Sequence, residues 1–440
     1  DRCDIRTCYE KKKLWNGFLH HIHYQPKNEE AEIFVHAMRT KGNESVYSEF
    51  EKLMQENRYQ QAAELLREKK GTSALLRNMD YIISRMDRED EQTFLSEFPE
   101  DCSTLILLQL LFRYEGVQRK DGRIFKFTQH NLMKVHYETP EESKKCQSRL
   151  TEEQVKEVGQ MIRSKLSEKL RNRLGKVYIE PSMKNYTLPL AENTSQGGLG
   201  VLSKGSRIPI DKGKKLRAFT YWEKVNDIDL SVFALTEDGN RREFSWRTMS
   251  RHQSGAITYS GDETSGYLGG SEYFDINLPE FKAQYSEYRY LIFCDNVYSG
   301  KNFNKCFCKA GYMLRDWDDS GQVYEPKTVK SAYLVNCEST FAYLFGIDLF
   351  TNEFVWLNVA KNSKSRVAGD TNLSFLTDYF HLTDVMNMYD FFSMMAEKIV
   401  EDPMEADVVG TDHEVKCTEE AQIIREYDFE KIRMLMEDAK

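Results

Sequence analysis

The chain has 440 residues, of which 40% are hydrophobic and 30% are charged, a balance typical of globular proteins rather than fibrous or disordered ones. Its length allows two or more domains with cores of their own. It contains no apolar run of about eighteen residues, so we expect no membrane-spanning helix. Because the chain begins with Asp1 rather than Met, we expect it to be part of a longer protein.

Charge and cysteine content further restrict the functional class and the cellular compartment of the protein. The formal charge is +2 over residues 1–200 and −11 over residues 201–440, which together give −9. An acidic second half argues against a nucleic-acid groove there. The nine cysteines are an odd number scattered over a long chain. They indicate free thiols in a reducing compartment, and we therefore expect a cytoplasmic protein.

Residues 1–180 are expected to form a helical domain. The segment TSALLRNMDYIISRM has apolar residues at helical spacing, and the preceding AAELLREKKG ends at Gly71, a typical helix C-cap. The segment ESVYSEFEKLM predicts a third helix, so a small solenoid-like bundle is expected. Within this domain GRIFKFT, residues 122–128, has the composition of a strand.

A further helix is predicted after the capping box formed by Thr151 and Gln154. Its apolar stripe runs to Leu174 and stops at Gly175, and comprises Val155, Val158, Ile162, Leu166, Leu170 and Leu174. The basic residues of its outer face, within residues 163–173, are Arg163, Lys165, Lys169, Arg171 and Arg173. A solvated face is the favoured interpretation, and a nucleic-acid-binding module is the alternative.

The composition changes after residue 180. Residues 181–200 are polar and glycine-rich, which predicts a linker between domains. Residues 201–365 then show short aromatic and β-branched segments separated by turns, which predicts an antiparallel sandwich of about nine strands. These segments are LRAFTYW, DIDLSVFAL, EFSW, AITYS, EYFDINL, YRYLIFCDNVY, AGYMLR, AYLVN and EFVWLNV. YRYLIFCDNVY is apolar on both faces and should be a central strand.

Residues 366–440 are expected to form helices that pack on the sandwich. One stripe ends near Pro403 and comprises Val385, Met388, Tyr389, Phe392, Met395 and Ile399. A last helix is expected from Thr418 onward. The predicted fold class is therefore α+β multidomain, with an N-terminal helical region, a β-sandwich and C-terminal helices.

Acidic residues gather around three of the predicted strands. Asp227 and Asp229 lie on one face at the start of DIDLSVFAL, which is otherwise apolar on nearly both sides. The other members are Asp262 and Glu263 in the SGDET turn, and Glu272 and Asp275 in EYFDINL. If these strands are neighbours, their oxygens could bind calcium, which takes about six to eight oxygen ligands. Ordinary turn aspartates are the alternative.

No sequence motif of a catalytic site is present, so a non-enzymatic role is favoured. An enzyme acting on a phosphorylated or sugar substrate is the third and least favoured alternative.

The same segments resemble a known family. The ordered series LSKGSRIPI, YWEKVNDIDLSVFAL, YSGDET, EYFDINL, RYLIFCDNVYSG, GYMLRD and IDLFTNEFVWLNV, over roughly residues 201–360, resembles the TerD-like family of bacterial tellurium-resistance and stress-response domains. The helical segment LLREKKGTSALLRN also resembles the helical part of larger bacterial cytosolic proteins that carry such a domain.

The resemblance implies a calcium-binding β-sandwich with no enzymatic activity known. Our leading hypothesis is a cytosolic bacterial stress-response scaffold that acts through protein partners. Asp227 and Asp229 match the family's D-x-D motif, and Asp262 matches its S-G-D motif. The loop after S-G-D departs from the family, since ETSGYLGGSE carries only Glu263 and Glu272 as acidic residues. This departure predicts a weak calcium site or the loss of one of two sites.

Overall fold

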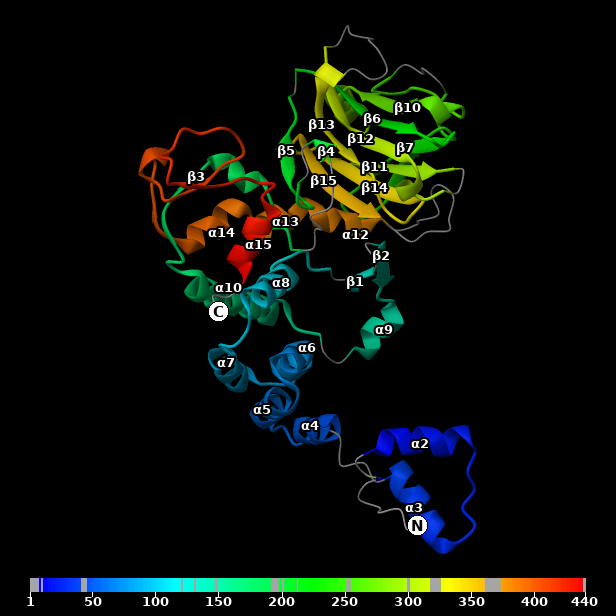
Figure 1. The fold of residues 1–440 in the computed structure, drawn as a ribbon, viewed down its shortest axis with the longest axis vertical. Helices are drawn as coiled ribbons and strands as arrows, with labels where there is room; N and C mark the ends of the chain where they lie inside the picture. Colours follow the sequence, from blue (N-terminus) through cyan, green and yellow to red (C-terminus); the bar gives the residue numbers. More distant parts are fainter. Residues whose placement is uncertain are drawn as a thin grey trace. The chain divides into compact units, whose positions relative to one another are not determined.

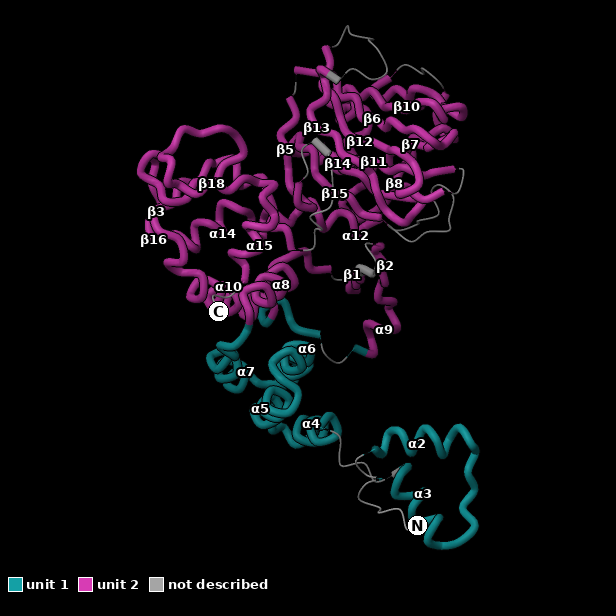
Figure 2. The backbone as a smooth tube through the Cα atoms, in the orientation of Figure 1, with its two compact units in different colours: residues 1–102, 146–154 teal, residues 103–145, 155–440 magenta. Residues whose placement is uncertain are grey.

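The structure is a computed structural model of the 440-residue chain. It describes residues 8, 11–40, 46–119, 122–129, 132–146, 149–190, 198–199, 202–211, 213–250, 255–298, 301–316, 326–360 and 373–437. The chain divides into two compact units, shown in Figure 2. Unit 1 comprises residues 1–102 and 146–154, and unit 2 comprises residues 103–145 and 155–440. This division does not coincide with the boundaries expected from the sequence.

The described part of unit 1 is helical. Its helices are α2 (Lys12–His21), α3 (Glu29–Thr40), α4 (Val46–Gln55), α5 (Tyr59–Lys70), α6 (Thr72–Ile83) and α7 (Arg88–Ser96). Gly71 separates α5 from α6 with a φ of 83°, a conformation that glycine adopts without strain. Leu66 of α5 and Met79 of α6 are buried. The helical character predicted for this region is confirmed.

Two six-stranded sheets form the largest part of unit 2 (Figure 1). The first has the order β4-β13-β12-β6-β10-β9, and its strands are β4 (Gly198–Leu199), β6 (Lys215–Glu223), β9 (Ile257–Tyr259), β10 (Gly270–Ile276), β12 (Phe307–Arg315) and β13 (Val329–Leu334). The second has the order β5-β15-β14-β11-β7-β8, and its strands are β5 (Arg207–Pro209), β7 (Ile228–Leu235), β8 (Arg241–Phe244), β11 (Tyr290–Val297), β14 (Phe341–Asp348) and β15 (Glu353–Ala360). Short helices between these strands are η2 (Gly266–Leu268), α11 (Leu278–Gln284), η3 (Phe303–Lys305) and η4 (Pro326–Thr328).

The two sheets share one core. Trp222 and Phe274 from the first sheet pack in the same cluster as Phe293 and Trp356 from the second. The outer face of the second sheet is covered as well, because Tyr290 packs with Phe380 from the segment after residue 372. Every residue of β7, β11 and β14 is therefore buried. This confirms that DIDLSVFAL is covered on both faces and that YRYLIFCDNVY is an interior strand.

Unit 2 also contains a four-stranded sheet, which the sequence patterns did not predict. Its order is β16-β3-β17-β18 and every neighbouring pair is parallel. The strands are β3 (Leu174–Ile179), β16 (Ala396–Ile399), β17 (Val408–Gly410) and β18 (Gln422–Ile424). Since β3 precedes the two six-stranded sheets in the chain and the other three strands follow them, the sandwich is an insertion within this smaller α/β body.

Unit 2 also contains helices and two short strands outside these sheets. They are α8 (Thr104–Tyr114), β1 (Ile124–Gln129), β2 (Leu132–Tyr137), α9 (Pro140–Lys145), α10 (Glu152–Leu170, which begins in unit 1), η1 (Pro181–Asn185), α12 (Ser374–Thr377), η5 (Asp378–His381), α13 (Leu382–Val385), α14 (Met388–Met395), η6 (Pro403–Glu405) and α15 (Phe429–Met436). The strand predicted at residues 122–128 is β1.

Several predicted helix boundaries are wrong. The capping box is present, since Thr151 and Gln154 exchange hydrogen bonds of 3.0 and 3.2 Å, but α10 ends at Leu170. Asn172 has a φ of 58°, which ends the helix before Leu174 enters β3. The stripe expected to reach Ile399 as one helix ends at Met395 and continues as β16. Thr418 precedes β18, and the last helix begins only at Phe429.

The first half of the expected linker is folded against other elements. Residues 181–190 include η1 and the buried Leu188, and Thr187 forms an isolated bridge with Asn387. This half of the segment is therefore packed against the smaller α/β body. Residues 191–197 and Gly200 lie outside the described residues.

Candidate metal centre

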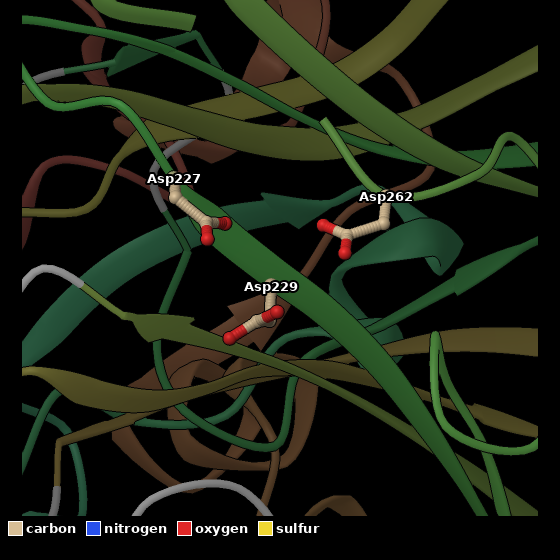
Figure 3. A group of neighbouring side chains, drawn as sticks. All are labelled: Asp227, Asp229 and Asp262. Atoms are coloured by element: carbon tan, nitrogen blue, oxygen red, sulfur yellow. The ribbon is translucent and has the colours of Figure 1, made fainter. Parts of the chain in front are cut away.

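Three of the aspartates expected to bind a cation lie together at one end of the sandwich. Asp227 immediately precedes β7 and Asp229 is its second residue, so both project from the same face. Asp262 lies in the loop after β9, a strand of the other sheet. Each of the three offers an oxygen, and these oxygens lie within 4.8 Å of one another. Figure 3 shows the carboxylates of Asp227 and Asp262 directed toward each other, with Asp229 beside them.

Glu272 holds this arrangement together. It lies on β10 of the first sheet and is fully buried. Its Oε2 accepts a hydrogen bond of 2.8 Å from the backbone N–H of Leu230 on β7, and its Oε1 accepts one of 3.1 Å from the backbone N–H of Glu263. Glu272 therefore connects the start of β7 to the loop that carries Asp262. It lies outside the group of three converging carboxylates.

The position of Leu230 explains why a side chain is needed there. The pairing between β7 and β8 begins only at Val232, which faces Phe244. The backbone N–H of Leu230 therefore lies beyond the end of β8, where a buried donor requires another acceptor. Glu272 provides that acceptor.

The other predicted residues lie nearby with different contacts. Glu263 Oε1 accepts a hydrogen bond of 2.8 Å from the backbone N–H of Ser265, which stabilises the turn after Asp262. Asp275 pairs with Arg217 in the first sheet at 2.6 Å, and a metal role for it is not favoured. The structure thus brings together Asp227, Asp229 and Asp262, with Glu263 and Glu272 positioning the loop around them.

Burial makes the carboxyl groups of Asp227 and Asp229 hard to ionise without a cation. Asp229 is only 3% exposed, whereas Asp262 is exposed at the opening of the site. Burial, together with the negative charges of Asp229, Asp262 and Glu263, raises the pKa of Asp227 to about 7. Burial also raises the pKa of Asp229 to about 6, although a hydrogen bond from Asn296 opposes this shift.

Asp227 also has a buried oxygen that no protein group satisfies. Its Oδ1 is buried and has no hydrogen-bond partner. A buried carboxylate oxygen without a donor or a cation is costly, because the charge has lost its hydration. This oxygen is therefore free to accept a cation or a proton.

Two polar residues of β11 lie behind the cluster and were missed by the sequence analysis. Asn296 Nδ2 donates a hydrogen bond of 3.2 Å to Asp229 Oδ2. Asp295 is fully buried and accepts hydrogen bonds of 2.8 and 2.9 Å from Thr220 Oγ1, and burial raises its pKa to about 8. The signal was present in the sequence, since two polar residues interrupt a strand that is otherwise apolar on both faces.

The donor set suits a hard cation. Among the described residues, these three aspartates form the one group of three or more His, Cys, Asp or Glu side chains whose donor atoms converge. Carboxylate oxygens on a strand end and a loop fit the flexible oxygen coordination of calcium, and three carboxylates can supply up to about six oxygens. The residues present therefore fit the calcium ion implied by the resemblance.

The basic helix is used partly in internal contacts. Arg163 Nε donates hydrogen bonds of 2.9 and 3.1 Å to the Glu115 carboxylate, and its Nη2 donates to the Val385 carbonyl at 2.7 Å. Arg173 donates hydrogen bonds to the carbonyl oxygen of Lys169 and to that of Glu437. These contacts stabilise unit 2 and remove two of the five basic residues from the face that the nucleic-acid alternative requires.

A second group of titratable side chains lies at the carboxyl ends of the parallel strands. Glu180 follows β3, Asp412 and His413 follow β17, and Glu426 follows β18. His413 Nδ1 lies 2.8 Å from Asp412 Oδ1, while Tyr186 donates a hydrogen bond of 2.9 Å to Asp412 Oδ2. Glu426 Oε2 is buried without a partner, and burial raises the pKa of Glu426 to about 7. The sequence analysis missed this group because it did not predict the sheet.

Comparison with known proteins adds no identity: no family model, no curated protein and no solved structure matches this chain. Among the described residues, no helix is both long and apolar enough to span a bilayer.

Proposed function

We propose that this chain is a non-enzymatic, calcium-binding scaffold of the TerD-like, tellurium-resistance and stress-response type, acting in the cytoplasm through protein partners. The observation that carries the proposal is the convergence of Asp227, Asp229 and Asp262 around a buried Asp227 oxygen that has no hydrogen-bond partner. The order of sequence motifs around these residues supports the family part of the proposal.

Calcium is the cation that this donor set favours. Calcium accepts oxygen ligands in irregular arrangements and with both oxygens of one carboxylate, whereas magnesium demands near-octahedral geometry and retains several waters. The loop that carries Asp262 supplies few further acidic groups, so we expect weak binding through one site. Exposure of Asp262 leaves room for water or a partner's oxygen to complete the coordination.

The composition of the cluster favours binding over catalysis. The three groups are all carboxylates, and the convergence of their oxygens within 4.8 Å suits a bound cation. A bound cation would cancel their mutual repulsion and connect the first sheet, through the Asp262 loop, to β7 of the second sheet. Calcium would therefore rigidify one end of the sandwich, which is a suitable role in a scaffold.

Thermal unfolding with calcium, magnesium or a chelator tests the proposal. Ligand present at one hundred times its Kd adds about 2.7 kcal/mol to the free energy of unfolding. We expect calcium to raise the melting temperature of the full chain, with a smaller effect of magnesium. Asp262→Asn should remove the response because it removes one ligand. Since Asp262 is exposed, the substitution should have little effect on the core.

Glu287→Gln is the matched control. Glu287 is exposed and lies before Tyr290, which pairs with Leu235 at the end of β7 remote from Asp227. The substitution removes the same charge as Asp262→Asn and should leave the calcium response intact. An equal melting temperature in calcium and chelator for the unmodified chain would refute the proposed site.

A further inference from the structure

Exposed apolar side chains lie next to the carboxylate cluster. Leu268 is 93% exposed, the highest value among the large hydrophobic side chains of the described residues, and its neighbour Tyr267 is 52% exposed. Both belong to η2, which follows the loop of Asp262 and Glu263. Tyr298, 55% exposed, follows β11, and its backbone N–H donates a hydrogen bond of 3.3 Å to the Asp227 carbonyl oxygen. We refer to Tyr267, Leu268 and Tyr298 as the apolar rim.

The backbone of η2 is firmly attached to the sandwich. Gly266 N–H donates a hydrogen bond of 2.8 Å to the Asn226 carbonyl, and Lys224 N–H donates one of 2.9 Å to the Tyr267 carbonyl. Lys224 and Asn226 both lie just before β7, the strand that carries Asp229. The turn that holds Leu268 in water is therefore fixed relative to the cluster.

Close packing under the turn fixes it further. A Cβ atom on Gly266 would lie 2.6 Å from Trp222 Nε1, and one on Gly270 would lie 2.5 Å from Trp222 Cε2. Only glycine allows this approach to the buried indole. Leu268 thus stays exposed because the turn is anchored on both sides, although burial of a leucine is normally favourable.

The charge at this end of the sandwich depends on the cation. Oxygens of Asp227, Asp229 and Asp262 lie within 4.8 Å of one another, and Glu263 follows Asp262 in the same loop. Without a cation they would repel an anionic surface. A bound calcium ion would neutralise much of this charge and, with Asp262 exposed, would have coordination positions open to a phosphate oxygen. Lys224 is exposed, and its backbone N–H bonds the Tyr267 carbonyl, so this segment also carries a positive charge.

We propose that this end of the sandwich docks, when calcium is bound, on an anionic phospholipid surface. Calcium joins the carboxylate cluster to a lipid phosphate, Leu268 enters the boundary of the acyl chains, and Tyr267 and Tyr298 lie at the level of the headgroups. The combination of a cation site with protruding aliphatic and aromatic side chains fits a lipid better than a free phosphate, which offers nothing for Leu268 to contact. The inference rests on the calcium site proposed above and names its partner.

Vesicle sedimentation with the full chain tests the inference. The vesicles contain phosphatidylcholine with phosphatidylserine, or phosphatidylcholine alone, each with calcium or with a chelator. We expect sedimentation only with the anionic vesicles and calcium. Leu268→Ser should weaken vesicle binding by about tenfold or more, because it removes one buried aliphatic side chain from the docked state.

Phe350→Ser is the matched control for the loss of an exposed apolar side chain. Phe350 is 81% exposed and follows Asp348, which pairs with Tyr290 at the end of the sandwich remote from Asp227. This variant should bind vesicles like the unmodified chain. The calcium-induced shift in melting temperature is measured for every variant, and Leu268→Ser should retain it.

The outcomes separate the two proposals. A chain that is stabilised by calcium but stays in the supernatant with anionic vesicles overturns the docking inference and leaves the calcium site intact. A second outcome also overturns the docking inference: glycerophosphoserine enhances the stabilisation by calcium, and Leu268→Ser leaves vesicle binding unchanged. This result would show that the site recognises phosphate alone. A chain without any calcium response overturns the proposed function and the docking inference together.

Discussion

The Glu272 carboxylate on β10 accepts a hydrogen bond of 2.8 Å from the backbone N–H of Leu230 on β7. This bond joins the two sheets of the sandwich directly beside the candidate metal centre. The second oxygen of Glu272 accepts the backbone N–H of Glu263. One buried side chain therefore sets the separation between the strand that carries Asp229 and the loop that carries Asp262. This relationship makes Glu272 a positioning residue whose effect on the cation passes through Asp229 and Asp262.

The first prediction concerns that connection. Glu272→Ala leaves the buried N–H of Leu230 and the partly buried N–H of Glu263 without acceptors, which should lower the free energy of unfolding by about 1–3 kcal/mol. Calcium affinity should fall as well, because the loop is no longer held against β7. Chemical denaturation and calcium titration measure both effects. Glu272→Gln retains a carbonyl acceptor for one of the two N–H groups, so its stability and calcium affinity should lie between those of Glu272→Ala and the unmodified chain. Unchanged calcium affinity in Glu272→Ala would contradict the positioning role.

The second prediction separates stability from binding at Asp227. The pKa of its carboxyl is raised to about 7 by burial and by the neighbouring carboxylates, so its ionised form destabilises the cation-free protein. Asp227→Asn should therefore raise the melting temperature in chelator at neutral pH while abolishing the shift caused by calcium. A variant that is less stable than the unmodified chain in chelator would show that Asp227 serves the fold without a cation.

The third prediction is the pH dependence of calcium stabilisation. Because the folded-state pKa values of Asp227 and Asp229 are raised to about 7 and about 6, their contribution to stability without a cation is greatest below their ordinary value of 3.8 and is lost as the pH rises through 6 and 7. Calcium must displace these protons, so the calcium-induced shift in melting temperature should be large above pH 7 and small near pH 5. A shift independent of pH over this range would place calcium elsewhere.

The fourth prediction concerns the smaller α/β body. Glu426 has a buried oxygen without a partner, and burial raises its pKa from 4.5 to about 7, so the stability it contributes is present below pH 4.5 and is lost as the pH rises through 7. Glu426→Gln should stabilise the chain above pH 7, on the order of 1 kcal/mol after allowance for partial exposure to solvent. Denaturation at two pH values measures this, with the exposed Glu430→Gln as control. Stabilisation that is equal at both pH values would contradict the role of ionisation.

The candidate site was predictable because its signals are local. Alternation along DIDLSVFAL places Asp227 and Asp229 on one face, and an aspartate in a short S-G-D turn marks the next acidic loop. The distinction between Asp262, which joins the cluster, and Glu272, which binds two backbone N–H groups, was not accessible from spacing. It depends on how β10 of one sheet lies against β7 of the other.

The parallel sheet shows where sequence patterns fail. The strands β17 and β18 have three residues each, too few to establish alternation, and β16 continues directly from α14. The first strand, β3, is separated from its partner β16 by the whole sandwich. Leu174 extends the apolar stripe of α10 by one position, so only the left-handed conformation of Asn172 reveals that the helix has ended.

Calorimetric titration of the full chain with calcium is the most direct test of the metal centre. The account predicts saturable binding of one calcium ion per chain, lost in Asp227→Asn and in Asp262→Asn and retained in Glu287→Gln. Binding that persists unchanged in both aspartate variants, or no binding by the unmodified chain at neutral pH, would contradict it.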